Sequence, residues 1–182
     1  MRNTNQKTLR LAQLAILIAL EAVLTFTPLG FILVPPISIT LMHIPVIVGA
    51  VLMGPVDGGI LGLSFGVFSM IKASTAAASP ADMAFSPFLS GEPVSSIVMC
   101  IIPRILLGVI AGGLYLLLSK KIKNGVLSMG ISAVAATFCH SMMVLVLLSV
   151  LFQSLPLKAV LAAAVVAVAV CKPLQRILRR AK

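Results

Sequence analysis

Apolar segments long enough to cross a bilayer fill almost all of this 182-residue chain, and most of its positive charges lie on one side of them. Of its residues, 60% are hydrophobic and 10% are charged, against about a quarter charged in an average soluble domain. A soluble core cannot bury that much apolar surface, whereas a lipid bilayer can solvate it. The chain is therefore predicted to be an integral membrane protein with several crossings.

A helix needs about 20 apolar residues to cross ~30 Å of hydrocarbon. By this criterion the sequence predicts six membrane helices, at residues 9–27, 38–54, 57–73, 95–118, 126–152 and 156–174. A membrane β-barrel is not expected, because we find no segment in which polar and apolar residues alternate with period two. The expected fold is all-α: residues 1–182 form one transmembrane domain, a six-helix bundle with two structured outer loops.

The basic residues predict the orientation of the bundle. Eleven of the fourteen lysines and arginines precede the first helix, link the fourth to the fifth, or end the chain. With six crossings all three groups face the cytoplasm, together with both termini, whereas five crossings would put the last group outside. The net charge of +10 is therefore interpreted as a topology signal and an attraction to anionic lipid, not as a nucleic-acid surface.

The start of the chain has the pattern of a signal peptide, with basic residues before an apolar run. Glu21 lies where cleavage would need a small residue, so the first helix is expected to stay uncleaved.

Two connections on the predicted outer side are long, at residues 27–36 and 73–93. Both mix Pro, Gly and Ser with large apolar side chains, which a disordered linker could not bury. A connection of about 20 residues with this composition is typical of a folded lid or binding loop. The outer face is therefore expected to recognise a ligand.

Small residues recur at helical spacing in two places: Gly58, Gly62 and Gly66 in the third helix, and Ala12, Ala15, Ala19 and Ala22 in the first. Such stripes let helix backbones approach closely in lipid. The glycines are predicted to pack within the protein. The alanine stripe fits packing within the chain and contact with another subunit equally well.

Arg104 is a charge about two turns inside the fourth helix, where insertion costs up to ~3 kcal/mol. Three interpretations stay open: it binds an anionic ligand, it extends outward to the membrane surface, or it pairs with Glu92.

His140 lies midway along the fifth helix, near Thr137 and Ser141. A histidine there contacts a ligand or makes an interhelical hydrogen bond, and both remain open. His43, early in the second helix, is a weaker candidate.

The other polar residues in apolar segments have structural interpretations. Glu21 and Lys158 are expected to extend to the membrane surface, and Asp57 to cap the third helix. Three cysteines without metal-ligand spacing are expected to pack or face lipid, forming neither disulfides nor a zinc site: Cys100, Cys139 and Cys171.

Catalytic motifs are not found in the sequence. It has no zinc-protease, nucleophile-elbow or phosphate-loop pattern and only four acidic residues, so neither enzymatic activity nor a cofactor is expected. Two alternatives are a membrane enzyme that uses His140 as a base or Arg104 as an anion clamp, and an assembly protein without a ligand.

Five segments resemble a known family, at residues 44–55, 58–62, 65–66, 85–88 and 103–108. They are similar to the substrate-binding S components of bacterial energy-coupling-factor (ECF) transporters. The resemblance covers most of residues 9–152 and is greatest to the pantothenate- and folate-type branch, pantothenate-type members first.

The resemblance implies a bacterial cell-membrane protein that binds a vitamin or precursor from outside. It would then join a membrane coupling subunit and two cytoplasmic ATPases, and topple in the bilayer to release its ligand inward. The alanine stripe, Ala15 and Ala19 above all, would contact the coupling subunit. The implied substrate-binding residues are Phe85, Ser86, Phe88, Arg104, Thr137, His140 and Ser141, with Arg104 pairing with the carboxylate of pantothenate.

Three features depart from the family pattern. His140 and Ser141 stand where an Asn-Thr-like pair is expected, the connection at residues 152–156 is short, and an alanine-valine run replaces polar residues of the sixth helix. These regions contact the ligand in the family, so the identity of the vitamin stays open.

Overall fold

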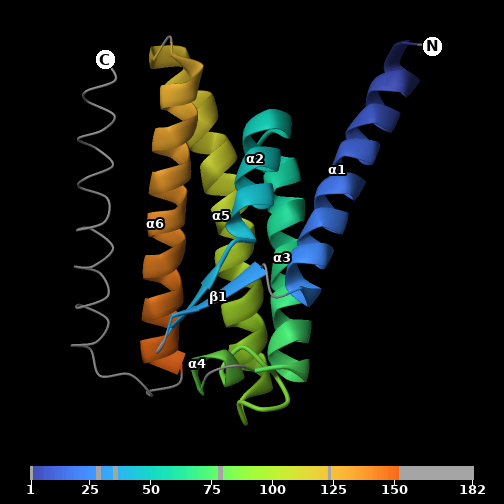
Figure 1. Ribbon diagram of the computed structural model, residues 1–182. Coiled ribbons are helices and arrows are strands. Elements are labelled where there is room, and N and C mark those ends of the chain that lie inside the picture. The colour runs from blue at the N-terminus through green and yellow to red at the C-terminus, as the bar shows by residue number, and fades with distance from the viewer. Residues whose placement is uncertain (1, 28–29, 35–36, 78–79, 123, 152–182) are drawn as a thin grey trace.

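The computed structural model describes residues 2–27, 30–34, 37–77, 80–122 and 124–151. In this part the chain forms six helices and two strands (Figure 1). The elements are α1 (Arg2–Phe26), β1 (Phe31–Val34), β2 (Ile37–Thr40), α2 (His43–Met53), α3 (Pro55–Thr75), α4 (Pro80–Met83), α5 (Pro93–Lys121) and α6 (Gly125–Leu151).

Four of these helices are long and apolar enough to cross a membrane: α1 over Gln6–Phe26, α3, α5 and α6. They agree with the crossings predicted at residues 9–27, 57–73, 95–118 and 126–152. The crossing predicted at 156–174 lies outside the described residues.

The prediction for residues 38–54 is wrong at its start, because α2 begins only at His43. Pro45 has no backbone N–H, so a helix running from residue 38 would lack one hydrogen bond and be distorted there. In the observed helix Pro45 lies in the first turn, where no N–H is needed. The helix has 11 residues and spans only about 16 Å, half of the hydrocarbon thickness.

The residues before α2 form a hairpin instead of a helix. β1 and β2 pair antiparallel, with Phe31 opposite Thr40 and Val34 opposite Ile37. β2 reads Ile-Ser-Ile-Thr, a short alternation of apolar and polar residues rich in β-branched side chains, which favours a strand. The all-α prediction is therefore corrected: the described part is a helix bundle with one two-stranded hairpin.

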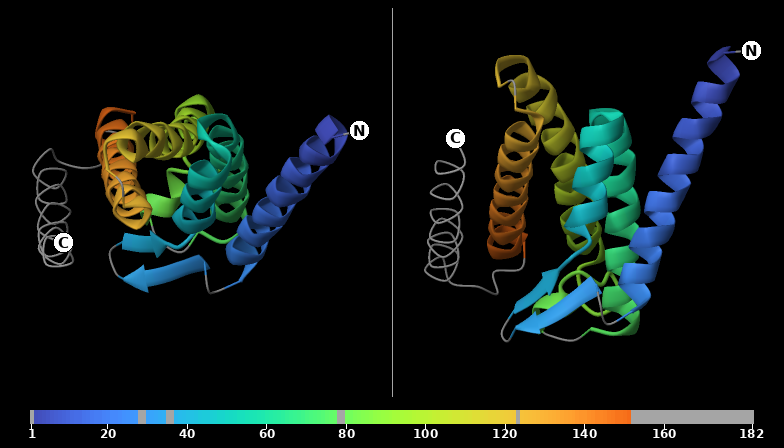
Figure 2. Two further views of the ribbon diagram at one scale, coloured as in Figure 1. Left: turned by 90° about the horizontal axis from the view of Figure 1, so that it is seen from above. Right: turned by 45° about the horizontal axis from the view of Figure 1, so that its top comes forward.

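The helices stand in a row, with α1 at one side and α6 at the other, and α2 leaning on α3 and α5 (Figures 1 and 2). The start of α1, the α2–α3 turn and the α5–α6 connection lie at one end of the bundle. The hairpin and α4 lie at the opposite end. Both regions predicted as structured loops are thus at one end.

Helices α3 and α5 pack closely because glycines face the partner backbone. A Cβ atom on Gly62 would lie 2.0 Å from the carbonyl oxygen of Arg104, and one on Gly108 would lie 1.9 Å from that of Gly58. No side chain fits at these distances. The prediction that the glycine stripe packs within the protein is confirmed.

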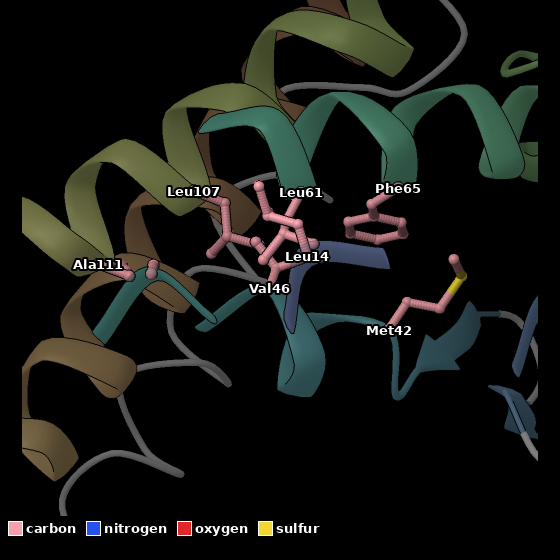
Figure 3. Close-up of a cluster of buried hydrophobic side chains, with 9 residues drawn as sticks. Leu14, Met42, Val46, Leu61, Phe65, Leu107 and Ala111 are labelled. Carbon is pink, nitrogen blue, oxygen red and sulfur yellow. The ribbon is translucent and has the colours of Figure 1, made fainter. Parts of the chain in front are cut away.

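The apolar core lies where α1, α2, α3, α5 and α6 converge (Figure 3). Leu61 and Phe65 of α3 are fully buried, as are Val46 of α2 and Leu107 of α5. Phe65 also borders a group of polar side chains, so the core supports the candidate site described below.

Helix α1 is held against α3 by two polar contacts as well as by apolar packing. Arg10 donates from Nε and Nη2 to the two carboxylate oxygens of Asp57, each at 2.6 Å. Deeper in the bundle, the Ser64 hydroxyl donates to the Glu21 carboxylate.

These contacts correct two predictions. Asp57 lies in the first turn of α3, but the hydrogen bonds found for its carboxylate among the described residues come from Arg10, and it is 1% exposed. Glu21 does not extend to the membrane surface, because its side chain is completely buried between α1 and α3. Cys100 is buried, Cys139 is exposed and both are free thiols. Lys158 and Cys171 lie outside the described residues.

Candidate functional site

Five side chains from four helices and one loop gather beside the apolar core. They are His43 of α2, Phe65 of α3, Phe85 of the α4–α5 loop, Arg104 of α5 and His140 of α6, and we call them the arginine–histidine cluster. Both histidines and the arginine belong to apolar helices. A polar side chain in such a helix costs free energy unless it has a partner or a function.

Arg104 is held in place by the proline that precedes it. Pro103 has no N–H, so the carbonyl of Met99, four residues earlier, loses its usual helical donor. The Arg104 side chain supplies a replacement, with Nη1 donating to that carbonyl oxygen at 2.6 Å. The sequence Pro103-Arg104 thus turns the guanidinium back along α5 into the protein.

The guanidinium of Arg104 lies over two aromatic rings. Its Cζ atom is 4.8 Å from the ring centroid of Phe85 and 5.5 Å from that of Phe65, within the range of cation–π attraction. The Arg104 side chain is 6% exposed, so it does not extend to the membrane surface.

Pairing of Arg104 with Glu92 is also wrong. Glu92 is exposed and its carboxylate accepts a hydrogen bond from Ser95. Within the described ranges no carboxylate lies at ion-pair distance from Arg104. Its Nε atom is buried, and no described residue supplies it with a hydrogen-bond acceptor. Contact of Arg104 with an anionic ligand, the third interpretation, stays a prediction.

The two histidines contact each other across the bundle. His43 Nε2 and His140 Nδ1 are 3.1 Å apart, a hydrogen bond between α2 and α6. Both rings also contact Phe65, that of His43 edge-on at 5.3 Å and that of His140 stacked at 6.5 Å. The interhelical hydrogen bond, one of the two interpretations left open for His140, is therefore present, and His43, the weaker candidate, is its partner.

The second ring nitrogen of His140 has no hydrogen-bond partner in the described part of the chain. His140 is 5% exposed, and its Nε2 atom is buried without a partner there, like Nε of Arg104. Leaving a buried polar atom unpaired costs about 1–3 kcal/mol, so two of them in one cluster call for an explanation. A ligand with acceptor groups would satisfy both.

Ser86 belongs to the loop that carries Phe85. Its hydroxyl accepts hydrogen bonds from the backbone of Phe88 and Leu89 and shares one with Ser74 at 2.9 Å. The buried Ser96 of α5 donates to the carbonyl of Ala84 at 2.7 Å. These bonds fold the loop and attach it to α3 and α5.

The remaining predicted site residues are not joined to the arginine–histidine cluster by any hydrogen bond or ring contact in the described part of the chain. Phe88 is 86% exposed, whereas Thr137 and Ser141 are half-buried on α6. Their contact with a ligand stays a prediction.

Sequence reasoning missed Phe65. A signal was present, because Phe65 lies next to Gly66 and three residues after Gly62, on the face of α3 that packs against α5. Its ring contacts both histidines and the arginine, so it links the predicted residues to one another.

The alanine stripe lies on another face of α1 from its buried residues. Ala12, Ala15 and Ala19 are exposed and Ala22 is half-buried, whereas Leu14 and Glu21 point into the bundle. Packing within the described part of the chain therefore does not account for the stripe, and its contact with another subunit stays a prediction.

Comparison with known proteins agrees with the resemblance found from the sequence. The profile of the family described as "ECF transporter, substrate-specific component" matches residues 9–178. Over 151 residues the chain is 35% identical to the pantothenic acid transporter PanT of Lactococcus lactis subsp. cremoris (strain MG1363), covering 79% of this chain and 74% of that protein. The chain therefore belongs to the substrate-specific components of ECF transporters.

Proposed function

We propose that this protein captures pantothenate at the outer face of the bacterial cell membrane and delivers it to a coupling subunit with two ATPases. The family is a transporter family, and the relative from Lactococcus lactis is named for pantothenic acid. The ligand, its site and the partner subunits are the parts that need experiments.

One observation carries the choice of ligand: the buried Arg104 has no carboxylate partner among the described residues, and its Nε lacks an acceptor. A ligand carboxylate would accept charge-assisted hydrogen bonds from this guanidinium. Phe85 and Phe65, which flank Arg104, would shield that ion pair from water, which strengthens it. Pantothenate also carries an amide and two hydroxyls, which offer further hydrogen-bonding groups to the site.

The proposed orientation places the hairpin and the α4–α5 loop outside. Arg10 on α1 and Lys120 and Lys121 at the end of α5 lie at the other end of the bundle, which the positive-inside rule assigns to the cytoplasm. With a sixth helix in residues 156–174, both termini would be cytoplasmic.

The first experiment is pantothenate binding by the detergent-purified protein, measured by isothermal titration calorimetry and by thermal shift. A ligand at 100 times its dissociation constant adds about 2.7 kcal/mol to the stability of the folded state, which a thermal shift detects. Arg104→Gln should weaken binding at least about tenfold, because it removes a hydrogen-bonded charge from the ligand carboxylate. Lys120→Gln, at an exposed position in the last turn of α5 and at the far end of the bundle, is the matched control.

Pantothenol, in which a neutral alcohol replaces the carboxylate, sharpens this test. The wild-type protein should prefer pantothenate to pantothenol, and the Arg104→Gln variant should lose that preference. Equal discrimination by both proteins would remove Arg104 from the carboxylate subsite. Conversion of the bound ligand by the isolated protein would favour the membrane-enzyme alternative.

The coupling face is tested by Ala15→Trp, which places a large side chain on the exposed alanine stripe. Uptake of pantothenate by cells with all subunits should be lost while binding to the isolated protein is retained. Leu20→Trp, at an exposed position on another side of α1, is the control and should support uptake. Normal uptake by Ala15→Trp would show that the stripe does not contact the coupling subunit.

A further inference from the structure

The hydrogen bond between His43 and His140 constrains where the protons of both rings lie. It joins Nε2 of His43 to Nδ1 of His140 at 3.1 Å and therefore contains one N–H group and one lone pair. A neutral imidazole carries a single N–H, on one of its two nitrogens. The direction of this bond thus decides what the buried Nε2 atom of His140 presents to a ligand.

Two arrangements are possible. If His140 donates from Nδ1, its Nε2 atom is a lone pair and can only accept. If His43 donates from Nε2, the proton of His140 lies on Nε2, and that atom is a donor. A doubly protonated His140 would bring a second buried positive charge into the same cluster as Arg104, and like charges repel strongly where little water screens them.

The other atom of the cluster that lacks a partner among the described residues distinguishes the two arrangements. Nε of Arg104 is a donor, so the ligand group that satisfies it must be an acceptor. An oxygen-rich anionic group beside His140 would be repelled by a lone pair on Nε2 and bound by an N–H there. A donor on His140 therefore agrees with the chemistry of Arg104, and an acceptor does not.

We propose that His43 is a positioning residue that sets the tautomer of His140. It donates from Nε2 to Nδ1 of His140, so that His140 and Arg104 offer two N–H donors to the oxygen atoms of one anionic ligand. This inference rests on the proposed function, because it assigns the subsite for the acid end of the same ligand. By this inference, the hydrogen bond from His43 to His140 contributes to recognition of the ligand as well as to the packing of α2 against α6.

The tautomer is measured directly by ¹⁵N NMR of the histidine-labelled full chain with pantothenate bound. The chain has only two histidines, so four ring nitrogens appear, and the spectrum of His43→Gln assigns them. We expect His140 protonated at Nε2 and unprotonated at Nδ1, and His43 protonated at Nε2. A proton on Nδ1 of His140 would overturn the inference.

Two variants separate positioning from packing. His43→Gln keeps an N–H donor and should bind pantothenate within about threefold of the wild type, whereas His43→Leu removes the donor and should bind about tenfold more weakly. In His43→Leu the His140 signals should change to a mixture of tautomers. Weaker binding with an unchanged tautomer would mean that His43 acts only through packing, contrary to the inference.

The remaining outcomes are also decisive. If His43→Leu does not fold, the wild-type spectrum and the His43→Gln affinity still test the proton positions. If pantothenate binds but His43→Leu binds it as well as the wild type, this inference fails while the proposed function stands. If pantothenate does not bind the wild-type protein, the proposed function fails and this inference fails with it.

Discussion

Gly62→Ala adds a single methyl group at the point where α3 crosses α5. The new Cβ would lie 2.0 Å from the carbonyl oxygen of Arg104 and 2.6 Å from its carbonyl carbon, whereas ordinary van der Waals contact begins at 3.4 Å. Both atoms belong to helix backbone and cannot rotate away. The two helices would have to separate by roughly 1 Å, because a closely packed interior has no free volume to absorb the methyl group.

The cost is estimated from two opposing effects. Overpacking a well-packed core costs about 1–3 kcal/mol, while alanine favours a helix over glycine by about 1 kcal/mol. We expect a net loss of about 1–2 kcal/mol in the free energy of unfolding, which lowers Tm by several degrees for a chain of this size. Because Arg104 itself is displaced, the affinity for pantothenate should fall as well.

The assay is thermal unfolding of the purified variant in detergent, followed by calorimetric titration with pantothenate. Gly113→Ala is the control. Gly113 also lies in α5, but a Cβ atom added there would meet no neighbouring atom within 4 Å. This variant should keep or raise Tm. Equal Tm and affinity for the two variants would refute the close α3–α5 packing and its link to Arg104.

Three further predictions test the polar contacts of α1 and the aromatic residues of the α4–α5 loop. Arg10→Gln leaves the carboxylate of Asp57, 1% exposed, without its cation and should lower Tm; Asp57→Asn added to it should restore part of the loss, and a further loss would contradict the pair. Phe85→Ala should weaken pantothenate binding several-fold through lost cation–π and apolar contact, whereas Phe88→Ala, at an exposed ring, should not; the reverse order of affinities would move the site to the loop surface. Glu21→Gln keeps an oxygen that accepts the hydrogen bond from Ser64 and removes the buried ionisable group, so Tm should stay the same or rise. A fall of several degrees in Tm would indicate that the carboxylate is required.

The long crossings were predictable because hydropathy over about 20 residues is a local property. Helices α1, α3, α5 and α6 all agree with the sequence prediction. The prediction of a helix over residues 38–54 was wrong for a local reason. Pro45 limits where a helix can begin, and the alternation of apolar and polar residues in β2 favours a strand.

The candidate site was predictable in part. Arg104 and His140 were found because polar groups are costly in apolar helices. Phe65 and the pairing of His43 with His140 were not, since residues 43 and 140 are 97 positions apart and nothing local reports their contact. The contacts of Glu21 with Ser64 and of Asp57 with Arg10 were not predicted either, because each joins α1 to α3. Without them, Glu21 was assigned to the membrane surface and Asp57 to a helix cap.

The sequence by itself determined that this chain is a membrane helix bundle and a member of its family, because hydropathy, charge bias and motif residues are properties of the linear chain. Only the tertiary structure decided which polar groups are satisfied and which are not. Pro103 frees a carbonyl that binds one part of Arg104, and the crossing of α2 with α6 pairs the histidines. Arg104 Nε and His140 Nε2 are then left without partners among the described residues. This is a result of packing in three dimensions, and these two atoms carry the proposal for the ligand.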